Sequence, residues 1–478
     1  MKLALVISYF FVLGTLAMYG LHRCALLWLY YRHKAKMPVS PGTPTRLPRV
    51  TAQLPIYNER HVVERLLRAV AEMEYPRELI EIQVLDDSDD ETQEVARGCV
   101  EKLRQAGLNI TYVHRVGRAG FKAGALAEGL KAASGELIAV FDADFVPPRD
   151  FLRKVVPFFA DPSVGMVQAR WGHLNRDDSL LTKAQAILLD GHFQVEHAAR
   201  SWSGRFFNFN GSAGVWRKEA ILAAGGWQGD TLTEDMDISY RAQLAGWKFV
   251  YLPEVSVPAE LPVEMSAFLS QQHRWAKGTA QTAKKLLPRI WRAALPLKVK
   301  MEATWHLGTG FVYVFMVLLA LVIFPAFWVR GVTVWSVALI DLPLFVLALG
   351  SASVFYVAAQ REIYGDRRAL KFLPFLTLLG IGISVSNARG VIEGLFEGTG
   401  TFERTPKCGY RSKAHGFRAL GLCFAVYMVL MIVIAIGSRC YVAIPFLLIF
   451  LAGYGYVVVA QSFESFRGLT MRRSSCGA

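Results

Sequence analysis

The sequence predicts an α/β domain built on a mostly parallel sheet, joined to a region of membrane-spanning α-helices. Three observations lead to this prediction. Between residues 49 and 141, short apolar runs alternate with segments in which apolar residues recur at helical spacing. From about residue 303 onward the chain becomes largely apolar, and another long apolar segment lies at the N-terminus. Overall, 53% of the residues are hydrophobic while the net charge is +14, an unusual pairing for a soluble enzyme.

The predicted sheet rests on apolar runs that are separated by helices. Strands are expected at residues 49–57, 80–85, 110–114 and 137–141, and helices at 59–73, 91–103 and 123–133. Alternation of this kind is typical of a mostly parallel sheet covered on both faces. Ligands of such sheets bind beyond the carboxyl ends of the strands. Because residues 86–87 and 142–144 carry carboxylates at two of these ends, we expect the binding site there.

The apolar segments are interpreted as membrane helices. Residues 3–31 are too long for the apolar part of a signal peptide, and no small-residue cleavage site follows them. Basic residues flank both ends of 371–390, so we expect a re-entrant or interfacial helix there. Further spans are expected near 303–329, 333–360, 418–437 and 441–462. The predicted domains are a transmembrane helix 1–33, a cytoplasmic domain 34–287, an amphipathic interfacial linker 288–302, a membrane region 303–466 with about four spans and a cytoplasmic loop 391–417, and a cytoplasmic tail 467–478.

The excess of positive charge indicates membrane orientation and not nucleic-acid binding. Lys and Arg are spread along the chain, and many flank apolar segments, as Arg32, Lys34 and Lys36 do. By the positive-inside rule we expect an integral protein of the inner (plasma) membrane with its N-terminus outside and its large domain in the cytoplasm. The six cysteines show no C-x-x-C spacing, so we expect reduced cysteines and no zinc site.

Asp142-Ala143-Asp144 places two carboxylates at the end of a predicted strand. Carboxylates hold the hard ions Mg²⁺ or Mn²⁺, which bridge to a nucleotide diphosphate and neutralise charge on the leaving nucleotide. An isolated D-x-D is more often a helix cap or a solvated turn. The motif therefore gains weight only together with other residues.

Asp86-Asp87 and Lys122 are further candidates for binding a nucleotide donor. The two carboxylates suit a ribose or a base, with an acidic turn that caps the helix at Glu91 as the alternative. Lys122 follows Gly120-Phe121 and can meet a phosphate as a point charge. Alone, a surface lysine at a helix start is the more frequent explanation.

Thr233-Glu234-Asp235 opens a predicted helix, with Thr233 as its N-cap. Asp235 can act as a general base that removes the proton from an acceptor hydroxyl. A capping box with acidic residues at the helix N-terminus is the equally weighted alternative. The small-residue loop with Gly211 and Ser212 can let an acceptor approach the backbone closely, or it is an ordinary turn.

Residues 271–275 read Gln-Gln-His-Arg-Trp and lie between the acidic region and the later apolar segments. Arg274 can bind a pyrophosphate through two hydrogen bonds, and Gln271 is a further candidate for binding the donor. Trp275 offers a flat apolar face to a sugar ring. Trp and Arg also favour the membrane interface, so an interfacial helix is the alternative.

As a set, these motifs resemble those of membrane glycosyltransferases of family two, in the processive branch with cellulose synthase and the plant cellulose-synthase-like glucomannan synthases. The resemblance covers about residues 48–290 strongly and implies a GT-A-type, Rossmann-like fold. The roles that it implies are nucleoside contacts for Asp87 and Asp142, a metal ligand in Asp144, a base in Asp235, a diphosphate contact for Arg274 and an acceptor contact for Trp275. Residues 402–407 are similar to the gating loop of cellulose synthases but carry Arg404 in place of Val.

The function that we expect is inverting transfer of a hexose from a nucleotide-sugar to a growing β-linked polysaccharide. UDP-glucose is the favoured donor, with GDP-mannose as the other candidate. The sequence leaves open whether the product is exported and whether accessory subunits take part. Transfer of a single sugar to diacylglycerol or ceramide is the alternative, separable by product length. A transporter or channel is disfavoured because the chain has no G-x-x-x-x-G-K-[ST] sequence and no run of charges within its spans.

Overall fold

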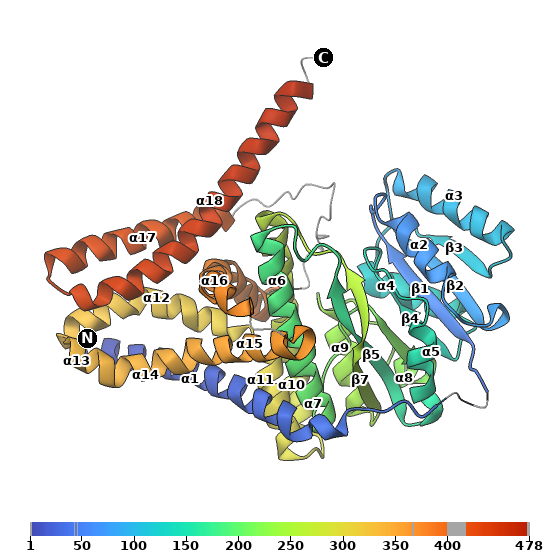
Figure 1. Cartoon of the computed structure of the whole chain (residues 1–478), viewed down its shortest axis with the longest axis horizontal. Helices are drawn as coiled ribbons and strands as arrows, with labels where there is room; N and C mark the ends of the chain where they lie inside the picture. The colour runs from blue at the N-terminus through green and yellow to red at the C-terminus, as the bar shows by residue number, and fades with distance from the viewer. Residues whose placement is uncertain (1, 43, 45, 366–367, 399–416, 476–478) are drawn as a thin grey trace.

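The computed structural model describes residues 2–42, 44, 46–365, 368–398 and 417–475 (Figure 1). Within these residues, one sheet has the strand order β3-β2-β1-β4-β6-β5-β7. β6 pairs antiparallel with β4 and β5, and the other neighbours are parallel, which confirms the mostly parallel sheet. The strands are β1 Val50–Ile56, β2 Ile80–Asp86, β3 Ile110–His114, β4 Leu137–Val140, β5 Val164–His173, β6 Gly214–Arg217 and β7 Lys248–Ala259.

The sheet carries a hydrophobic core on each face, as β4 illustrates. Leu137 and Ala139 belong to one buried cluster, while Ile138 and Val140 belong to the other. Side chains of a strand point alternately to opposite faces, so a strand buried on both faces reads as a continuous apolar run. This is why the strands at the start of the domain were predictable. The helices over the first core are α2 Val63–Ala71, α3 Thr92–Gln105 and α5 Phe151–Val155, and those over the second are α4 Phe121–Ala132, α7 Ala198–Trp202, α8 Lys218–Ala223 and α9 Glu234–Leu244.

The remaining helices join the sheet domain to a bundle of apolar helices. α6 Leu180–Gly191 continues through a π-helical turn, His192–His197, into α7. Leu26, Leu29 and Tyr30 of α1 are part of the second core of the sheet domain, so this N-terminal helix packs on both regions. The bundle and its connections consist of α1 Lys2–His33, α10 Met265–Arg292, α11 Leu297–Leu307, α12 Phe311–Arg330, α13 Val334–Ser336, α14 Leu342–Phe345, α15 Ser351–Tyr364, α16 Leu373–Phe396, α17 Phe417–Gly437 and α18 Ile444–Ser475.

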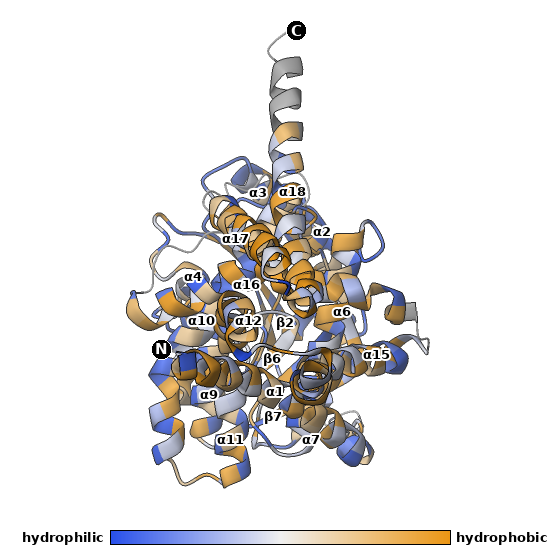
Figure 2. Ribbon diagram, turned by 90° about the vertical axis from the view of Figure 1, so that its left-hand side faces the viewer, coloured by the Kyte–Doolittle hydropathy of each residue, from blue (hydrophilic) through white to orange (hydrophobic). Residues whose placement is uncertain are grey.

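Six helical segments among the described residues are long and apolar enough to cross a membrane. Figure 2 shows hydrophobic residues along much of α12, α16 and α17. Five of the segments correspond to the expected spans, and the sixth contains 371–390. The re-entrant placement of that sixth segment and the domain boundaries stay predictions. The segments are 2–36, 311–330, 334–364, 369–396, 417–437 and 441–466.

Close packing of α10 on α16 fixes the Gln-Gln-His-Arg-Trp segment against the bundle. A Cβ atom at Gly394 of α16 would lie only 2.4 Å from the carbonyl oxygen of Lys277 in α10, and one at Gly390 would lie 2.7 Å from the carbonyl oxygen of His273. Lys277 also pairs with Glu393 at 3.2 Å. The two glycines therefore let the backbones approach, as small residues do between membrane helices. The similarity to a gating loop at 402–407 lies outside the described residues.

Candidate active site

A cavity of about 210 Å³ lies at the carboxyl ends of β1 and β4 and brings together nearly all of the predicted site residues. Asp86 and Ser212 do not line it. Each of the segments 86–87, 142–144, 233–235 and 271–275 contributes at least one side chain, although they are far apart in the sequence. The predicted residues that line the cavity are Asp87, Lys122, Asp142, Asp144, Gly211, Thr233, Glu234, Asp235, Gln271, Arg274 and Trp275.

Asp86 and Ser212 support the site from behind its wall. Asp86 is fully buried and accepts hydrogen bonds from the Tyr112 hydroxyl at 2.6 Å and from the backbone N–H of Ser88 at 2.8 Å. The hydroxyl oxygen of Ser212, also buried, accepts from the backbone N–H of Asp142 at 2.9 Å. The structure therefore gives these two residues a bracing position in place of the direct donor and acceptor contacts that the sequence predicted.

Asp87 faces the cavity and is held by two parallel hydrogen bonds from Arg115. Nε of Arg115 donates to Oδ1 of Asp87 at 2.7 Å, and Nη2 donates to Oδ2 at 2.5 Å. Arg115 also donates to the carbonyl oxygen of Phe121 at 3.0 Å. A planar guanidinium in this geometry fixes a carboxylate strongly. The acidic turn does contact the start of α3, but through Asp90, which accepts from the N–H of Thr92, and not through Asp87.

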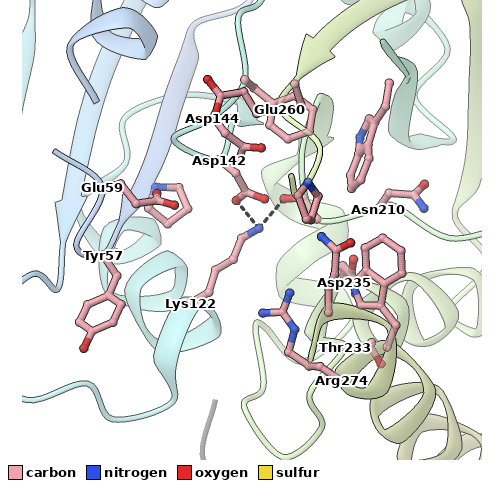
Figure 3. A pocket seen from close by; sticks show the side chains of 18 of the residues that line it. Tyr57, Glu59, Lys122, Asp142, Asp144, Asn210, Thr233, Asp235, Glu260 and Arg274 are labelled. Atoms are coloured by element: carbon pink, nitrogen blue, oxygen red, sulfur yellow. Dashed lines mark hydrogen bonds and ion pairs between the residues drawn. The ribbon is translucent and has the colours of Figure 1, made fainter. Parts of the chain in front are cut away.

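Lys122 is not a surface lysine but lies among the acidic residues of the cavity (Figure 3). Its Nζ atom is 2.5 Å from Oδ1 of Asp142, 3.9 Å from Oε1 of Glu234, and donates to the carbonyl oxygen of Gly211 at 2.8 Å. Burial alone would lower the pKa of Lys122, but the carboxylates of Asp142 and Glu234 outweigh it and raise that pKa above the ordinary value. The ammonium is therefore charged and is the positive centre of this wall.

Asp142 and Asp144 follow β4 directly, on a turn that reaches into the cavity, where Glu260 of the segment after β7 joins them (Figure 3). All their donor atoms are carboxylate oxygens, which suit Mg²⁺ or Mn²⁺ and not softer metals. Among the described residues, no group of three or more His, Cys, Asp or Glu side chains is arranged to hold an ion alone. Ions of the Mg²⁺ type are commonly held by one or two carboxylates together with substrate phosphates and water, so the residues present fit such an ion.

The Thr233-Glu234-Asp235 segment starts α9, and Thr233 occupies the predicted N-cap position. Its hydroxyl does not cap the helix; it pairs with the hydroxyl of Thr282 in α10 at 3.1 Å. The alternative of a capping box is thus wrong, because the hydroxyl of Thr233 bonds to the neighbouring helix instead. Burial in the cavity, followed by the charge of Glu234, raises the pKa of Asp235 to about 7. A carboxyl group with this pKa is suited to accept a proton near neutral pH.

Helix α10 delivers the Gln271, Arg274 and Trp275 side chains to the same cavity. Gly278 makes this possible, since a Cβ atom there would lie 2.6 Å from Cγ2 of Thr233 and would force the helix away from α9. The guanidinium of Arg274 interacts electrostatically with Glu234, Asp142 and Asp235. The cavity wall therefore combines cations from two helices, α4 and α10, with carboxylates from the turn after β4 and from the start of α9.

The sequence placed Asn210 in the small-residue loop but did not single out its side chain or the histidines behind it as site residues. Asn210 lines the cavity, its amide nitrogen lies 3.1 Å from Nε2 of His192, and its amide oxygen bonds to the ring of His197. The π-helical turn 192–197 inserts an extra residue and turns both rings toward Asn210, and such turns are frequent at functional sites. Glu196 then links His192 to a buried chain of charges that ends at Glu302 and His22. The π-helical turn is what brings His192 and His197 together at Asn210. The helical spacing of apolar residues in the sequence therefore gave no indication of this cluster.

Comparison with known proteins agrees with this geometry. Residues 48–278 match the family model described as "Glycosyltransferase like family 2". The chain is 47% identical over 250 residues to "Glucomannan 4-beta-mannosyltransferase 1" of Oryza sativa subsp. japonica, a match that covers 51% of this chain and 48% of that protein. It is 38% identical over 359 residues to "Glucomannan 4-beta-mannosyltransferase 2" of Arabidopsis thaliana, covering 74% of this chain and 66% of that protein.

A solved structure shares the fold. The mannosyltransferase PcManGT from Pyrobaculum calidifontis, in complex with GDP-Man and Mn²⁺, superposes with a TM-score of 0.53 at 23% sequence identity, covering 80% of this chain and 99% of that one. The chain spans about half to two thirds of the length of the curated relatives it matches. The family expected from the motifs is confirmed: residues 48–278 are a glycosyltransferase domain of family 2, in a chain related to the glucomannan 4-beta-mannosyltransferases.

Proposed function

We propose that the protein is a membrane glycosyltransferase that moves a mannosyl group from GDP-mannose onto the hydroxyl of a growing β-linked polysaccharide, with inversion at the transferred carbon. One observation carries the proposal. Asp235, a carboxylate with a pKa near 7, shares a cavity with two cations, Lys122 and Arg274. The carboxylates of Asp142 and Asp144 line the same cavity. This is the combination that a displacement needs, with a base for the incoming hydroxyl and positive charge for the outgoing diphosphate.

In the proposed reaction, Asp235 accepts the proton of the acceptor hydroxyl while the hydroxyl oxygen forms a bond to the anomeric carbon of the donor. The bond from that carbon to the diphosphate breaks, and its electron pair leaves with the nucleotide. Arg274 and Lys122 attract the negative charge that develops on the diphosphate. An Mg²⁺ or Mn²⁺ ion, held by Asp144 with Asp142, would add further positive charge there when bound. No covalent nucleophile is required.

The other site residues orient the two substrates. Asp87, fixed by Arg115, is placed to accept hydrogen bonds from the nucleoside. Trp275 offers its ring to the terminal sugar of the acceptor. Gly211 has no side chain between Asp235 and Lys122, so the acceptor hydroxyl can reach both the base and the donor.

The related proteins support GDP-mannose over the UDP-glucose that we expected from the sequence. Both relatives named above are mannosyltransferases, and the solved structure with this fold contains GDP-Man and Mn²⁺. The six long apolar helices support an integral membrane protein. The basic residues that flank these helices support a cytoplasmic catalytic domain at the plasma membrane.

A donor panel on isolated membranes tests the proposal. Radiolabelled GDP-mannose with Mn²⁺ should give a labelled polymer, and UDP-glucose should give much less. Asp144→Asn should abolish metal-dependent transfer, whereas the exposed Asp178→Asn should not, because Asp178 does not line the cavity. Normal turnover of Asp144→Asn over a Mn²⁺ titration would refute the metal assignment. A wild-type product with a single added sugar on a lipid would refute polysaccharide synthesis.

A further inference from the structure

A second cavity, of about 400 Å³, lies among the apolar helices. Its lining is mostly apolar, whereas the catalytic cavity is lined by many charged side chains. α1, α12, α14, α15, α16 and α18 all contribute to its wall. Most of the lining is aliphatic or aromatic, for example Leu16, Leu319, Phe345, Leu349 and Ile381. A chamber of this size and lining suits an apolar ligand.

The charged side chain of Arg23 lies at one end of this cavity. Arg23 and Tyr19 lie one helical turn apart on α1, and Arg23 interacts electrostatically with Tyr313 and Tyr356. This end faces the catalytic domain, because the Tyr19 hydroxyl donates to the carbonyl oxygen of Gly308 and the adjacent His22 pairs with Glu302 at 3.1 Å. The cavity therefore has an apolar body and a cationic mouth at the junction of the two regions.

Arg23 is a half-buried cation inside a predicted span, and the described residues supply it with no hydrogen bond or ion pair. The acidic side chain that shares its surroundings, Glu196, is already paired with His192 at 3.0 Å and Arg200 at 3.3 Å. A charge at this depth is costly unless a partner compensates it, which makes it an indicator of a binding site. An anionic ligand bound at this place would supply the partner that the described residues do not.

A sugar polymer does not match this lining. A glycan presents hydroxyl groups along its whole length, and each needs a hydrogen-bond partner when it leaves water. Two of the cavity hydroxyls, those of Ser353 and Thr377, already donate to the carbonyl oxygens of Leu349 and Leu373 in their own helices. An acyl chain needs no such partners, and its burial against aliphatic walls is favourable.

We propose that this cavity holds one acyl chain of an anionic phospholipid, with the phosphate of the headgroup bound to Arg23 on the side of the catalytic domain. The lipid would fill the space between α1, α12 and α16 and complete the packing of the helices that carry α10. It is a structural ligand and not a sugar acceptor. The inference rests on the membrane helices and is independent of the proposed donor or product.

Native mass spectrometry of the purified, delipidated full-length protein tests the proposal, with added phosphatidylglycerol or phosphatidylcholine of identical acyl chains as the probes. The wild type should retain one phosphatidylglycerol about tenfold more tightly than phosphatidylcholine, as expected for one charge-assisted contact. Arg23→Gln should remove most of this preference. Arg32→Gln is the matched control, since Arg32 is exposed at the end of the same helix and does not line the cavity.

Substitutions that fill the cavity are a second test of the lipid proposal. A Cβ atom at Gly380 meets nothing within 4 Å, and Gly380 lines the cavity, so Gly380→Leu should occupy the space and lower retention of both lipids. Gly455→Leu is its control, because that position is equally open but lies outside the cavity. Gly350→Leu fills the same space from another helix if Gly380→Leu does not fold.

Three results would overturn the assignment. One is an unchanged preference for phosphatidylglycerol in Arg23→Gln, and another is unchanged lipid retention in folded cavity-filling variants. The third is transfer of sugar onto the retained lipid when a nucleotide-sugar is added, because the lipid would then be an acceptor.

Discussion

The Nζ atom of Lys122 lies 2.5 Å from Oδ1 of Asp142 and so ties the first turn of α4 to the loop of the two metal-binding candidates. Glu234 is 3.9 Å away on the other side, and the positive charge also lowers the pKa of Asp235. Burial opposes this effect and wins, which leaves the pKa of Asp235 at about 7. Lys122 thus contacts Asp142, a candidate donor-binding residue, and also influences the pKa of the candidate base Asp235.

Replacing Lys122 should therefore change two measurable quantities. Lys122→Met should raise the KM for the donor about tenfold or more, because a charge-assisted contact to the diphosphate is lost. It should also move the acidic limb of the kcat/KM profile to higher pH, since loss of a nearby cation makes Asp235 harder to ionise. Lys131→Met is the control, as Lys131 is exposed near the end of the same helix. Unchanged donor affinity and an unchanged pH profile would contradict this role.

Asp235 sets the pH dependence of the wild type. The base works only when ionised, so kcat/KM should rise as pH increases through about 7 and level off above it, since kcat/KM reports groups of the free enzyme. Asp235→Asn should lower the single-turnover rate by about 10²–10⁴-fold while donor binding persists. Donor binding and transfer measured on the same preparation check both statements. A weak-binding variant with a normal single-turnover rate would make Asp235 a positioning residue.

Substituting Gly211 tests whether the open space between Asp235 and Lys122 is needed for activity. Its φ is +83°, and an added Cβ would lie 3.1 Å from Oδ2 of Asp235 and 3.2 Å from Nζ of Lys122. Gly211→Ala should lower kcat strongly. Gly204→Ala is the matched control, because its φ is +69° but its Cβ meets nothing within 4 Å. Both variants should lose about 1–2 kcal/mol of stability from the left-handed backbone, so equal activities in the two would sink the argument.

Trp275 separates polymer synthesis from single transfer. If its ring holds the terminal sugar of the acceptor, Trp275→Ala should shorten the products or stop elongation, while hydrolysis of the donor by water continues. Arg274→Ala should instead weaken donor binding whatever the acceptor is. Product lengths by gel or mass spectrometry, compared with wild type, decide between these effects. If Trp275→Ala still makes full-length polymer, the Trp275 ring does not hold the acceptor.

The sequence by itself determined the first half of the sheet and most of the site. β1, β2, β3 and β4 are short apolar runs followed by polar turns, and strands buried on both faces leave that pattern whatever their neighbours are. The position of Asp142 and Asp144 beyond β4 followed directly. The strands β5, β6 and β7 were not predicted, although helices separate them along the chain. The antiparallel place of β6 between β4 and β5 is a matter of topology.

Only the tertiary structure decided which of two adjacent polar residues reaches the cavity. Successive side chains at a strand end point in opposite directions, so Asp86 turns to Tyr112 of the next strand while Asp87 faces the site. Likewise the hydroxyl of Thr233 pairs with α10, a helix that begins 32 residues later, and not with its own helix. A sequence pattern shows only how apolar and polar residues repeat along one segment. The directions of the Asp86 and Thr233 side chains depend on partners that the fold brings in from other segments.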